Sequence, residues 1–430
     1  MTVLAELRMV PAASARAGWD APRGVRLVLS AAVLFTLLVG ANLATPLYAG
    51  LEARLGYGSL GTSVAFASYV LTLVGVLLAA GHWSDHVGRR AAMVLAVVLG
   101  LAGAAVFAGA GSLAQLCAGR ALQGAAVGLA MGACTAALRE LLPHRGVWAG
   151  RVTLLASSAG VAAGPALGGL AAEAAGGPGG AAVPFVVHCG VLAALLVPLV
   201  AVRARPALLP AAGPGRARLL APRSLRHALP DGAARRTFSL AAGVGFLSFA
   251  MFGYQLSFAP GSFAAATGLT SLPATGALAG LSLAASAASQ LLAPAPRGLR
   301  AARAEVPAAL AVLGVSLGAL AWGTAAGSAP VLVAASLAGG LGQGVAFRSL
   351  FTRVSRLCGP ASLAQTVSLL YVVTYLGSAV PVVALGAAAA RVGVVPASVA
   401  FLVVCAATGV ALAALAARVP STTLQDAQAS

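Results

Sequence analysis

The sequence predicts an all-α integral membrane protein with twelve transmembrane helices in two pseudo-symmetric six-helix bundles. Three observations predict this fold class: an apolar composition, twelve apolar runs of membrane-spanning length, and a partial repeat between the two halves of the chain. Of the 430 residues, 60% are hydrophobic and 8% are charged. A soluble chain carries about 25% charged residues, so this chain has too few charges to cover a surface in water.

Apolar runs long enough to cross a bilayer recur along the whole chain. About 20 residues cross the hydrocarbon core as a helix, and lipid offers the backbone no other hydrogen-bond partners. The first run is too long for the core of a signal peptide, and no clean cleavage site follows it. The predicted spans are 27–49, 60–81, 91–112, 114–138, 152–175, 183–202, 237–260, 270–293, 305–326, 329–351, 364–390 and 395–417.

The arginines predict the orientation of these spans. All 27 basic residues are Arg, and they fall in alternate connecting segments, with the exceptions of Arg54, Arg391 and the intramembrane Arg120. Cytoplasmic segments of membrane proteins carry this excess of positive charge. We therefore expect a multi-pass protein of the cell membrane with both termini in the cytoplasm. No nucleic-acid partner is expected, since the charges are not gathered on one polar domain.

The longest connection is rich in Arg, Pro and Gly and divides the chain into two sets of six spans. The expected organisation is a cytoplasmic N-terminal tail at 1–26, an N-terminal six-helix bundle at 27–202, a cytoplasmic linker at 203–236, a C-terminal six-helix bundle at 237–417 and a cytoplasmic C-terminal tail at 418–430.

The two halves share a short internal repeat. AGRALQGAAVG at 118–128 is matched 220 residues later by AGGLGQGVAFR at 338–348, including the paired Gln and Gly. The fourth span is therefore expected to recur as the tenth. Parallel six-helix halves with a ligand site between them near mid-membrane are the architecture of one large transporter class.

Three local motifs resemble those of the major facilitator superfamily, and the resemblance covers essentially the whole chain. GHWSDHVGRR resembles the family's loop between the second and third spans, with departures at Trp83 and His86 and matches at Gly81, Ser84, Asp85, Gly88, Arg89 and Arg90. In the fourth span, the family's Arg-x-x-Gln-Gly pattern is similar to Arg120, Gln123 and Gly124. In the fifth, GVAAGPALGG resembles a signature associated with antiporters, especially drug exporters, at Gly160, Gly164, Pro165, Gly168 and Gly169.

The resemblance implies a conformational latch at Gly81, Asp85, Gly88, Arg89 and Arg90, which grips the other half in one conformation and releases it in another. The glycines permit a sharp turn, and the two arginines are expected at the depth of anionic lipid headgroups. Asp85 is expected to face a helix N-terminus or an Arg. The alternative interpretation is a solvated turn that only sets the topology. The counterpart at 294–302 has no acid, so the latch is expected on one side only.

Arg120 is the most costly residue to place in the membrane, at about 2.5–3.5 kcal/mol near the centre of a span. It is expected to face the protein interior or a wet cavity and to share a helix face with Gln123. No Asp or Glu falls in mid-membrane, so we expect a neutral or anionic substrate. The alternative is an Arg that only holds helices together. His188 is a candidate proton carrier or a hydrogen-bonded residue of the core; Asp85 and Glu52 are other proton candidates, and uncoupled transport remains open.

Other hydrogen-bonding side chains are candidates either for lining the central cavity or for bonding between helices: Asn42, Thr45, Tyr48, Tyr254, Gln255 and Gln343. The small residues of the fifth span are expected to let a neighbouring backbone approach closely, and Pro165 can kink that helix.

No phosphate-binding loop, paired carboxylates, zinc motif or hydrolase elbow is present, so we expect no enzyme, no cofactor and no metal. The sequence therefore predicts a secondary transporter for a small-molecule substrate, surrounded by membrane lipid. The favoured activity is efflux of amphiphilic molecules by alternating access in exchange for protons. The alternatives are an importer or uniporter of a small metabolite and a membrane sensor that does not transport.

Overall fold

A computed structural model describes residues 21–81, 83–142, 145–177, 179–202, 232–293, 299–357 and 360–418. Parts of the expected organisation lie outside the described residues, namely 1–20 of the N-terminal tail, 203–231 of the linker, 419–430 of the C-terminal tail and most of the segment before the ninth span.

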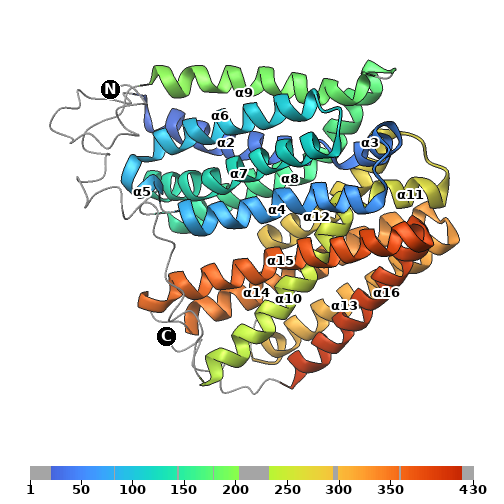
Figure 1. Ribbon diagram of the computed structural model, residues 1–430. Coiled ribbons are helices and arrows are strands. Elements are labelled where there is room, and N and C mark those ends of the chain that lie inside the picture. The colour runs from blue at the N-terminus through green and yellow to red at the C-terminus, as the bar shows by residue number, and fades with distance from the viewer. Residues whose placement is uncertain are drawn as a thin grey trace. The chain divides into compact units, whose positions relative to one another are not determined.

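The described residues form helices and no strands (Figure 1). Before the linker the helical elements are α2 (Arg23–Asn42), η2 (Thr45–Leu47), α3 (Tyr48–Leu55), α4 (Ser59–Ala80), α5 (Trp83–Val87), α6 (Arg89–Ala108), α7 (Leu113–Leu141), α8 (Gly146–Ala175), η3 (Gly180–Ala182) and α9 (Val183–Ala201). After it they are α10 (Gly232–Ser257), α11 (Ala259–Thr267), α12 (Leu272–Leu292), α13 (Leu299–Ala326), α14 (Ala329–Leu357), α15 (Pro360–Val392) and α16 (Val394–Ala417).

In the described part of the chain, twelve helical segments are long and apolar enough to cross a membrane. They coincide with the twelve predicted spans, which confirms the fold class. Several helices extend beyond the apolar runs, because hydropathy changes sign at the first charges whereas the helix continues through them. Thus α14 runs to Leu357, through Arg348 and Arg356.

The first span is broken near its end. α2 stops at Asn42, a short 3₁₀ turn with Pro46 follows, and α3 resumes the helical path. Proline has no N–H to donate and is poorly tolerated inside a helix. The seventh span has a similar break, between α10 and the proline-initiated α11. The same interruption therefore occurs in the first span of each half.

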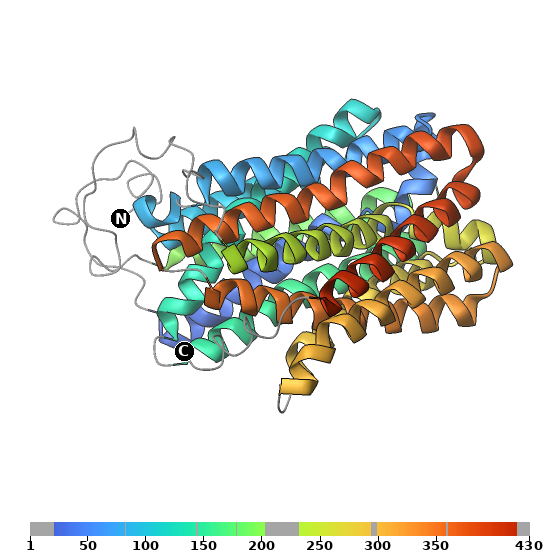
Figure 2. The same ribbon diagram turned by 90° about the horizontal axis from the view of Figure 1, so that it is seen from below.

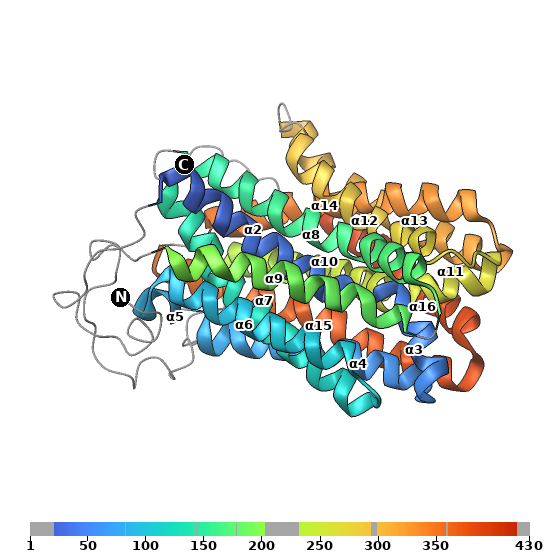
Figure 3. The same cartoon turned by 90° about the horizontal axis from the view of Figure 1, so that it is seen from above.

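The chain divides into two compact units, one made of Met1–Ala44 with Ser68–Arg223 and the other of Thr45–Ala67 with Ser224–Ser430. In the first unit, α2 packs along α7 and α8, and α6 packs along α7 and α9 (Figure 3). In the second unit, α10 packs along α14 and α15, and α13 packs along α14 and α16 (Figure 2). The helix pairings of the first six spans are thus repeated by the last six.

The paired Gln-Gly of the internal repeat occupies equivalent contacts in both units. Gly124 of α7 lies against the backbone of α4, where a Cβ would be 2.2 Å from the oxygen of Tyr69. Gly344 of α14 lies against α12, where a Cβ would be 2.4 Å from the oxygen of Ser286. Only glycine permits such close approach of two helix backbones.

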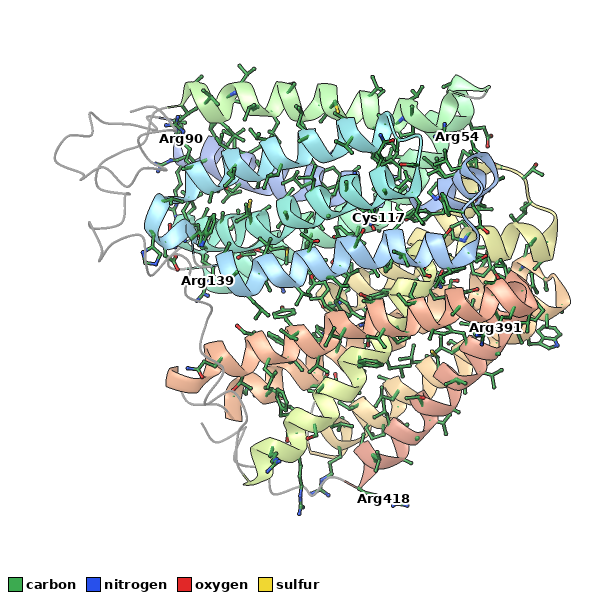
Figure 4. All side chains as sticks on the ribbon, in the orientation of Figure 1. Arg54, Arg90, Cys117, Arg139, Arg391 and Arg418 are labelled. Carbon is green, nitrogen blue, oxygen red and sulfur yellow. The ribbon has the colours of Figure 1, made fainter. Side chains whose placement is uncertain are left out.

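Within each unit, the labelled arginines lie near the ends of the long helices (Figure 4). In the first unit, Arg90 and Arg139 lie at one end, away from Cys117 in the first part of α7 (Figure 4). In the second unit, Arg54 and Arg391 lie at one end and Arg418 lies at the other (Figure 4). This is the separation expected if Arg54 and Arg391 are on the outer side.

Candidate functional site

Arg120 of α7 is buried inside the first unit, with 1% of the residue exposed. Its Nη1 donates to the backbone oxygen of Ala41 in α2 at 2.5 Å and to Oε1 of Gln123 at 2.7 Å. Its guanidinium carbon lies 4.4 Å from the centre of the Tyr69 ring of α4. Three helices therefore surround one guanidinium group, and Arg120 shares a face with Gln123 as predicted.

The Arg120 site keeps a net positive charge. No carboxylate in the described part of the chain forms an ion pair with Arg120. Nε of Arg120 and Nε2 of Gln123 are buried without a hydrogen-bond partner among the described residues. A buried polar group without a partner costs about 1–3 kcal/mol, and more when it is charged. The arrangement therefore offers donors and positive charge to an acceptor on a ligand.

Two further candidates of the first unit have different surroundings. Asn42 is buried, and its Nδ2 donates to the oxygen of Leu38 at 2.7 Å within its own helix. His188 of α9 is also buried, and its ring packs against α2 at Gly40, where a Cβ would lie 2.0 Å from Nε2. Among the described residues, none forms a hydrogen bond with the His188 side chain. Its contact with α2 is therefore van der Waals packing against Gly40.

The antiporter-type motif of α8 forms a stripe of close backbone contacts with α2. Three of its glycines stand four residues apart, and each faces a carbonyl one turn further along α2. A Cβ added to Gly160 would lie 2.6 Å from the backbone oxygen of Phe35. A Cβ added to Gly164 would lie 2.8 Å from the oxygen of Val39, and one added to Gly168 would lie 2.2 Å from the oxygen of Leu43. Pro165 lies inside the same helix and, like Gly169, is buried. We call Gly160, Gly164 and Gly168 the glycine stripe.

The predicted latch loop contains a short helix, α5, between two glycine positions. Gly81 follows α4, and its oxygen would lie 2.6 Å from a Cβ on Gly132 of α7. Gly88 has φ 94°, a left-handed conformation that side chains rarely adopt, and it begins α6. A turn at Gly88 is therefore confirmed. The five-residue helix was not predicted, because one turn is too short to show a period.

Arg89 is the centre of an ion-pair cluster in this loop. Its Nη1 lies 2.5 Å from Oδ1 of Asp85 and 2.6 Å from Oγ of Ser84. Its Nη2 lies 2.7 Å from Oε1 of Glu140, near the end of α7. Asp85 therefore faces an Arg, one of the two predicted partners. Because both carboxylates are about half exposed, each pair contributes at most about 1 kcal/mol.

Arg90 does not extend toward lipid headgroups as expected. It is 8% exposed, and its guanidinium donates to the backbone oxygens of Leu199 at 2.8 Å and Val200 at 3.0 Å. These carbonyls lie in the last turn of α9, where helix oxygens lack intrahelical partners and attract cations. Arg90 therefore ties α6 to the end of α9.

The second unit has a charge pair that the sequence did not predict. Nη2 of Arg348 in α14 lies 3.2 Å from Oε1 of Glu305 in α13. Ser349 donates to the other carboxylate oxygen at 2.7 Å, and Arg348 also donates to the oxygen of Ala293 at 2.7 Å. This pair lies outside the counterpart segment 294–302, so the expectation of a latch on one side only stays a prediction. At the repeat offset of 220 residues, Glu305 corresponds to Asp85, and that alignment was the available signal.

The polar candidates of α10 and α14 are fully enclosed in the second unit. Tyr254 is stacked on Phe401 with ring centroids 5.7 Å apart, and its hydroxyl lies 3.3 Å from Oγ of Ser262. Gln343 accepts a hydrogen bond of 2.5 Å from Ser286 of α12, so it bonds between helices. Both amide atoms of Gln255 are buried without a partner among the described residues.

Thr45 and Tyr48 line a cavity of about 310 Å³ in the second unit. We call it the Glu52 cavity, because Glu52 is the charged residue among those that line it. The remaining lining residues are Ala49, Ala53, Thr62, Ser257, Phe258, Gly261, Ala265 and Val394. The carboxylate of Glu52 accepts hydrogen bonds from Ser59 at 3.1 Å and Thr62 at 3.0 Å.

Tyr57 lies beside this cavity, in the turn between α3 and α4. Burial raises the pKa of the Tyr57 phenol, and the neighbouring Tyr48 and Glu52 raise it further. The phenol is therefore neutral at physiological pH.

Sequence comparison identifies one family. The profile of the Major Facilitator Superfamily matches residues 29–381. Comparison with curated proteins gives no significant match.

Solved structures with the same fold cover nearly the whole chain. The human organic anion transporter MFSD10 (TETRAN) is 21% identical, with a TM-score of 0.63 over 92% of this chain and 100% of that one. A bacterial homologue of the human lysosomal transporter Spinster, inward-facing and unoccupied, is 16% identical, with a TM-score of 0.69 over 94% and 98%. The nucleoside transporter NupG is 12% identical, with a TM-score of 0.70 over 91% and 98%.

Proposed function

The chain belongs to the major facilitator superfamily, and on that premise we propose that it exports small, neutral or anionic amphiphilic molecules in exchange for protons. It is a multi-pass secondary transporter and not an enzyme. In the proposed mechanism it works by alternating access in the cell membrane, with both termini in the cytoplasm. Substrate would enter from the cytoplasm or the inner leaflet and leave on the outer side.

The observation that carries this proposal is the Arg120 site. A guanidinium buried among three helices without a carboxylate partner, in the described part of the chain, favours a ligand that brings its own negative or electron-rich group. Hydrogen bonds between Arg and an anionic oxygen are roughly twice as strong as neutral ones. A lipophilic cation would instead meet like charge there.

Export rather than import is supported by the glycine stripe. In the family, the motif that forms it is associated with antiporters, and here each glycine holds α8 against a carbonyl of α2. Such backbone contact seals two helices without side chains between them. The Arg89 cluster joins α5, α6 and α7 of the first unit through pairs weak enough to break, and as the latch it would exchange these pairs for contacts with the other half.

Three titratable groups are candidates for carrying the proton. His188 lies within a span, Asp85 belongs to the Arg89 cluster, and Glu52 faces its own cavity. Each would change charge as the exporter cycles. Substitution of each by its neutral isostere, followed by measurement of proton release during substrate movement, distinguishes them.

One structural neighbour is named as an organic anion transporter and another as a nucleoside transporter. Likeness at 12–21% identity concerns the fold. The proposal of an anionic substrate therefore rests on Arg120. The organic anion transporter among the structural neighbours is consistent with it.

Flux measurements in proteoliposomes test the proposal. The probes are carboxyfluorescein as an organic anion and ethidium as a lipophilic cation, each with and without an imposed pH step. We expect proton-driven movement of carboxyfluorescein and little movement of ethidium. Strong preference for ethidium contradicts the substrate class, and inward-only flux favours an importer. No flux of a broad probe set in either condition favours a sensor that does not transport.

A further inference from the structure

The Glu52 cavity and the Arg120 site belong to different units and have opposite chemical character. Every residue that lines it belongs to the second unit, whereas Arg120 and its contacts belong to the first. The cavity is built where α3 and the start of α4 pack with the end of α10, α11 and the start of α16. It therefore joins the outer end of the first two spans to the second half of the chain.

Glu52 is the acidic group of the cavity. None of the described residues forms an ion pair with it, and Arg54, the nearest basic residue in sequence, does not line the cavity. Two hydroxyls, of Ser59 and Thr62, hold one carboxylate oxygen each. A carboxylate accepts about four hydrogen bonds, so about two positions stay open to a donor within the cavity.

The walls of the cavity suit an organic cation better than a bare metal ion. Tyr48 and Phe258 bring aromatic rings, and alanines, Gly261 and Val394 form the remaining apolar surface. Aromatic faces attract ammonium groups, at about 0.5–2 kcal/mol for each good contact. A divalent metal ion would need several oxygen ligands, and in the described residues no group of three His, Cys, Asp or Glu could hold one.

The size of the cavity limits the ligand. At about 310 Å³ it has twice the volume of the roughly 150 Å³ apolar cavity that binds benzene in an engineered protein. A single aromatic ring with a short aminomethyl arm is a ligand of this size, and its nitrogen would lie against Glu52 with its ring against Tyr48 and Phe258.

We propose that the Glu52 cavity is a binding site for a small organic ammonium ion, separate from the anion-accepting site at Arg120. The ammonium donates to the open positions of the Glu52 carboxylate, and its apolar part fills the space between α3, α10 and α11. A bound cation thereby holds Thr45–Ala67 to the second half of the chain. Glu52 is also a candidate proton carrier of the proposed export, but equilibrium binding of a cation to the purified protein is measured without transport and therefore tests the site separately.

Binding of benzylammonium to the purified full-length protein in lipid nanodiscs tests this proposal. Benzyl alcohol and benzoate serve as neutral and anionic ligands of matched shape, and affinity is measured by calorimetry or ligand-observed NMR. We expect saturable binding of benzylammonium, at least about tenfold weaker binding of benzyl alcohol and no binding of benzoate. Equal affinity for benzylammonium and benzyl alcohol means an apolar cavity only and overturns the proposal, as does no binding of benzylammonium.

Three variants locate the site. Glu52→Gln keeps the shape and the acceptor for Ser59 or Thr62 but removes the charge, and should weaken benzylammonium at least about tenfold. Glu173→Gln removes another acid, at the end of α8 in the first unit, and should leave the affinity unchanged. Gly261→Leu should also abolish binding, because a Cβ there meets only Ala49, at 3.6 Å, and the longer side chain enters the cavity. Affinity within twofold of the parent protein in both Glu52→Gln and Gly261→Leu contradicts the assignment.

Discussion

Arg348 and Glu305 form an ion pair of 3.2 Å whose signs are reversed relative to the pair of Arg89 and Glu140. In the first unit the third span carries the base and the fourth span the acid. In the second unit the ninth span carries the acid and the tenth span the base. The two units thus conserve a contact between equivalent helices while exchanging which helix supplies each charge.

This reversed pair should stabilise the second unit. Glu305→Gln is expected to lower the free energy of unfolding by about 1 kcal/mol, since both side chains are only partly exposed and Arg348 loses its anion. The double exchange Glu305→Arg with Arg348→Glu should recover part of the loss. Thermal unfolding of the purified protein in one detergent measures both. If the double exchange is no more stable than Glu305→Gln, the contribution of the pair is not electrostatic.

The Arg89 cluster predicts an order of effects on transport. One guanidinium serves both Asp85 and Glu140, so Arg89→Gln should reduce the transport rate more than Asp85→Asn or Glu140→Gln alone. Substrate affinity should change little, because the cluster does not contact the Arg120 site. Initial rates and equilibrium binding separate the two quantities. Equal rates for all three variants would show that the loop acts only as a connection.

Arg120 should require its guanidinium shape as well as its charge. Lys carries the charge without the planar set of donors, so Arg120→Lys is expected to weaken binding of an organic anion about tenfold or more. Arg120→Gln should abolish binding. Equilibrium binding of carboxyfluorescein to purified protein measures both, and unchanged binding in Arg120→Gln would remove Arg120 from the substrate site.

Tyr69 provides a matched control for the same site. The Tyr69 ring lies against the Arg120 guanidinium. Tyr69→Phe keeps the aromatic face and should resemble the parent protein, whereas Tyr69→Ala should cost about 0.5–2 kcal/mol of binding. The same fluorescent anion reports the difference. Equal losses in both variants would point to the hydroxyl instead of the ring.

The glycine stripe should be intolerant of a single methyl group. Gly168→Ala places a Cβ 2.2 Å from a backbone oxygen of α2, and neither helix backbone can move aside easily. Overpacking of this kind lowers the free energy of unfolding by about 1–3 kcal/mol. Gly150→Ala is the matched control on α8, because a Cβ there meets nothing within 4 Å. It should be neutral or slightly stabilising, since Ala favours helix over Gly. Thermal unfolding should separate the two variants, and equal stabilities would show that α2 and α8 can part freely.

The sequence predicted the features that are imposed by the lipid environment. Lipid requires long apolar helices, and therefore hydropathy alone located all twelve spans. The burial of Arg120 and its shared face with Gln123 also followed from the cost of charge in the membrane and the helical period.

Contacts between helices were not predictable in the same way. Tyr69 stands about fifty residues before Arg120, and only folding brings its ring to the guanidinium. Arg90 was predicted to contact lipid headgroups, because its hydrogen-bond partners are backbone oxygens at the end of α9. No residue type in the sequence marks such partners. The pair of Glu305 and Arg348 was not predicted because the comparison of the two halves stopped at 294–302, three residues before Glu305 aligns with Asp85.

The interruption at Thr45–Leu47 gives the first span a mechanical role. On one side of it, α2 is held to α8 by the glycine stripe, and on the other side α3 belongs to the second unit. A single transmembrane segment therefore contributes to both units, with α2 in the first and α3 in the second. In the proposed alternating access, the break at Thr45–Leu47 would let α2 and α3 change direction separately, whereas an unbroken first helix would have to bend.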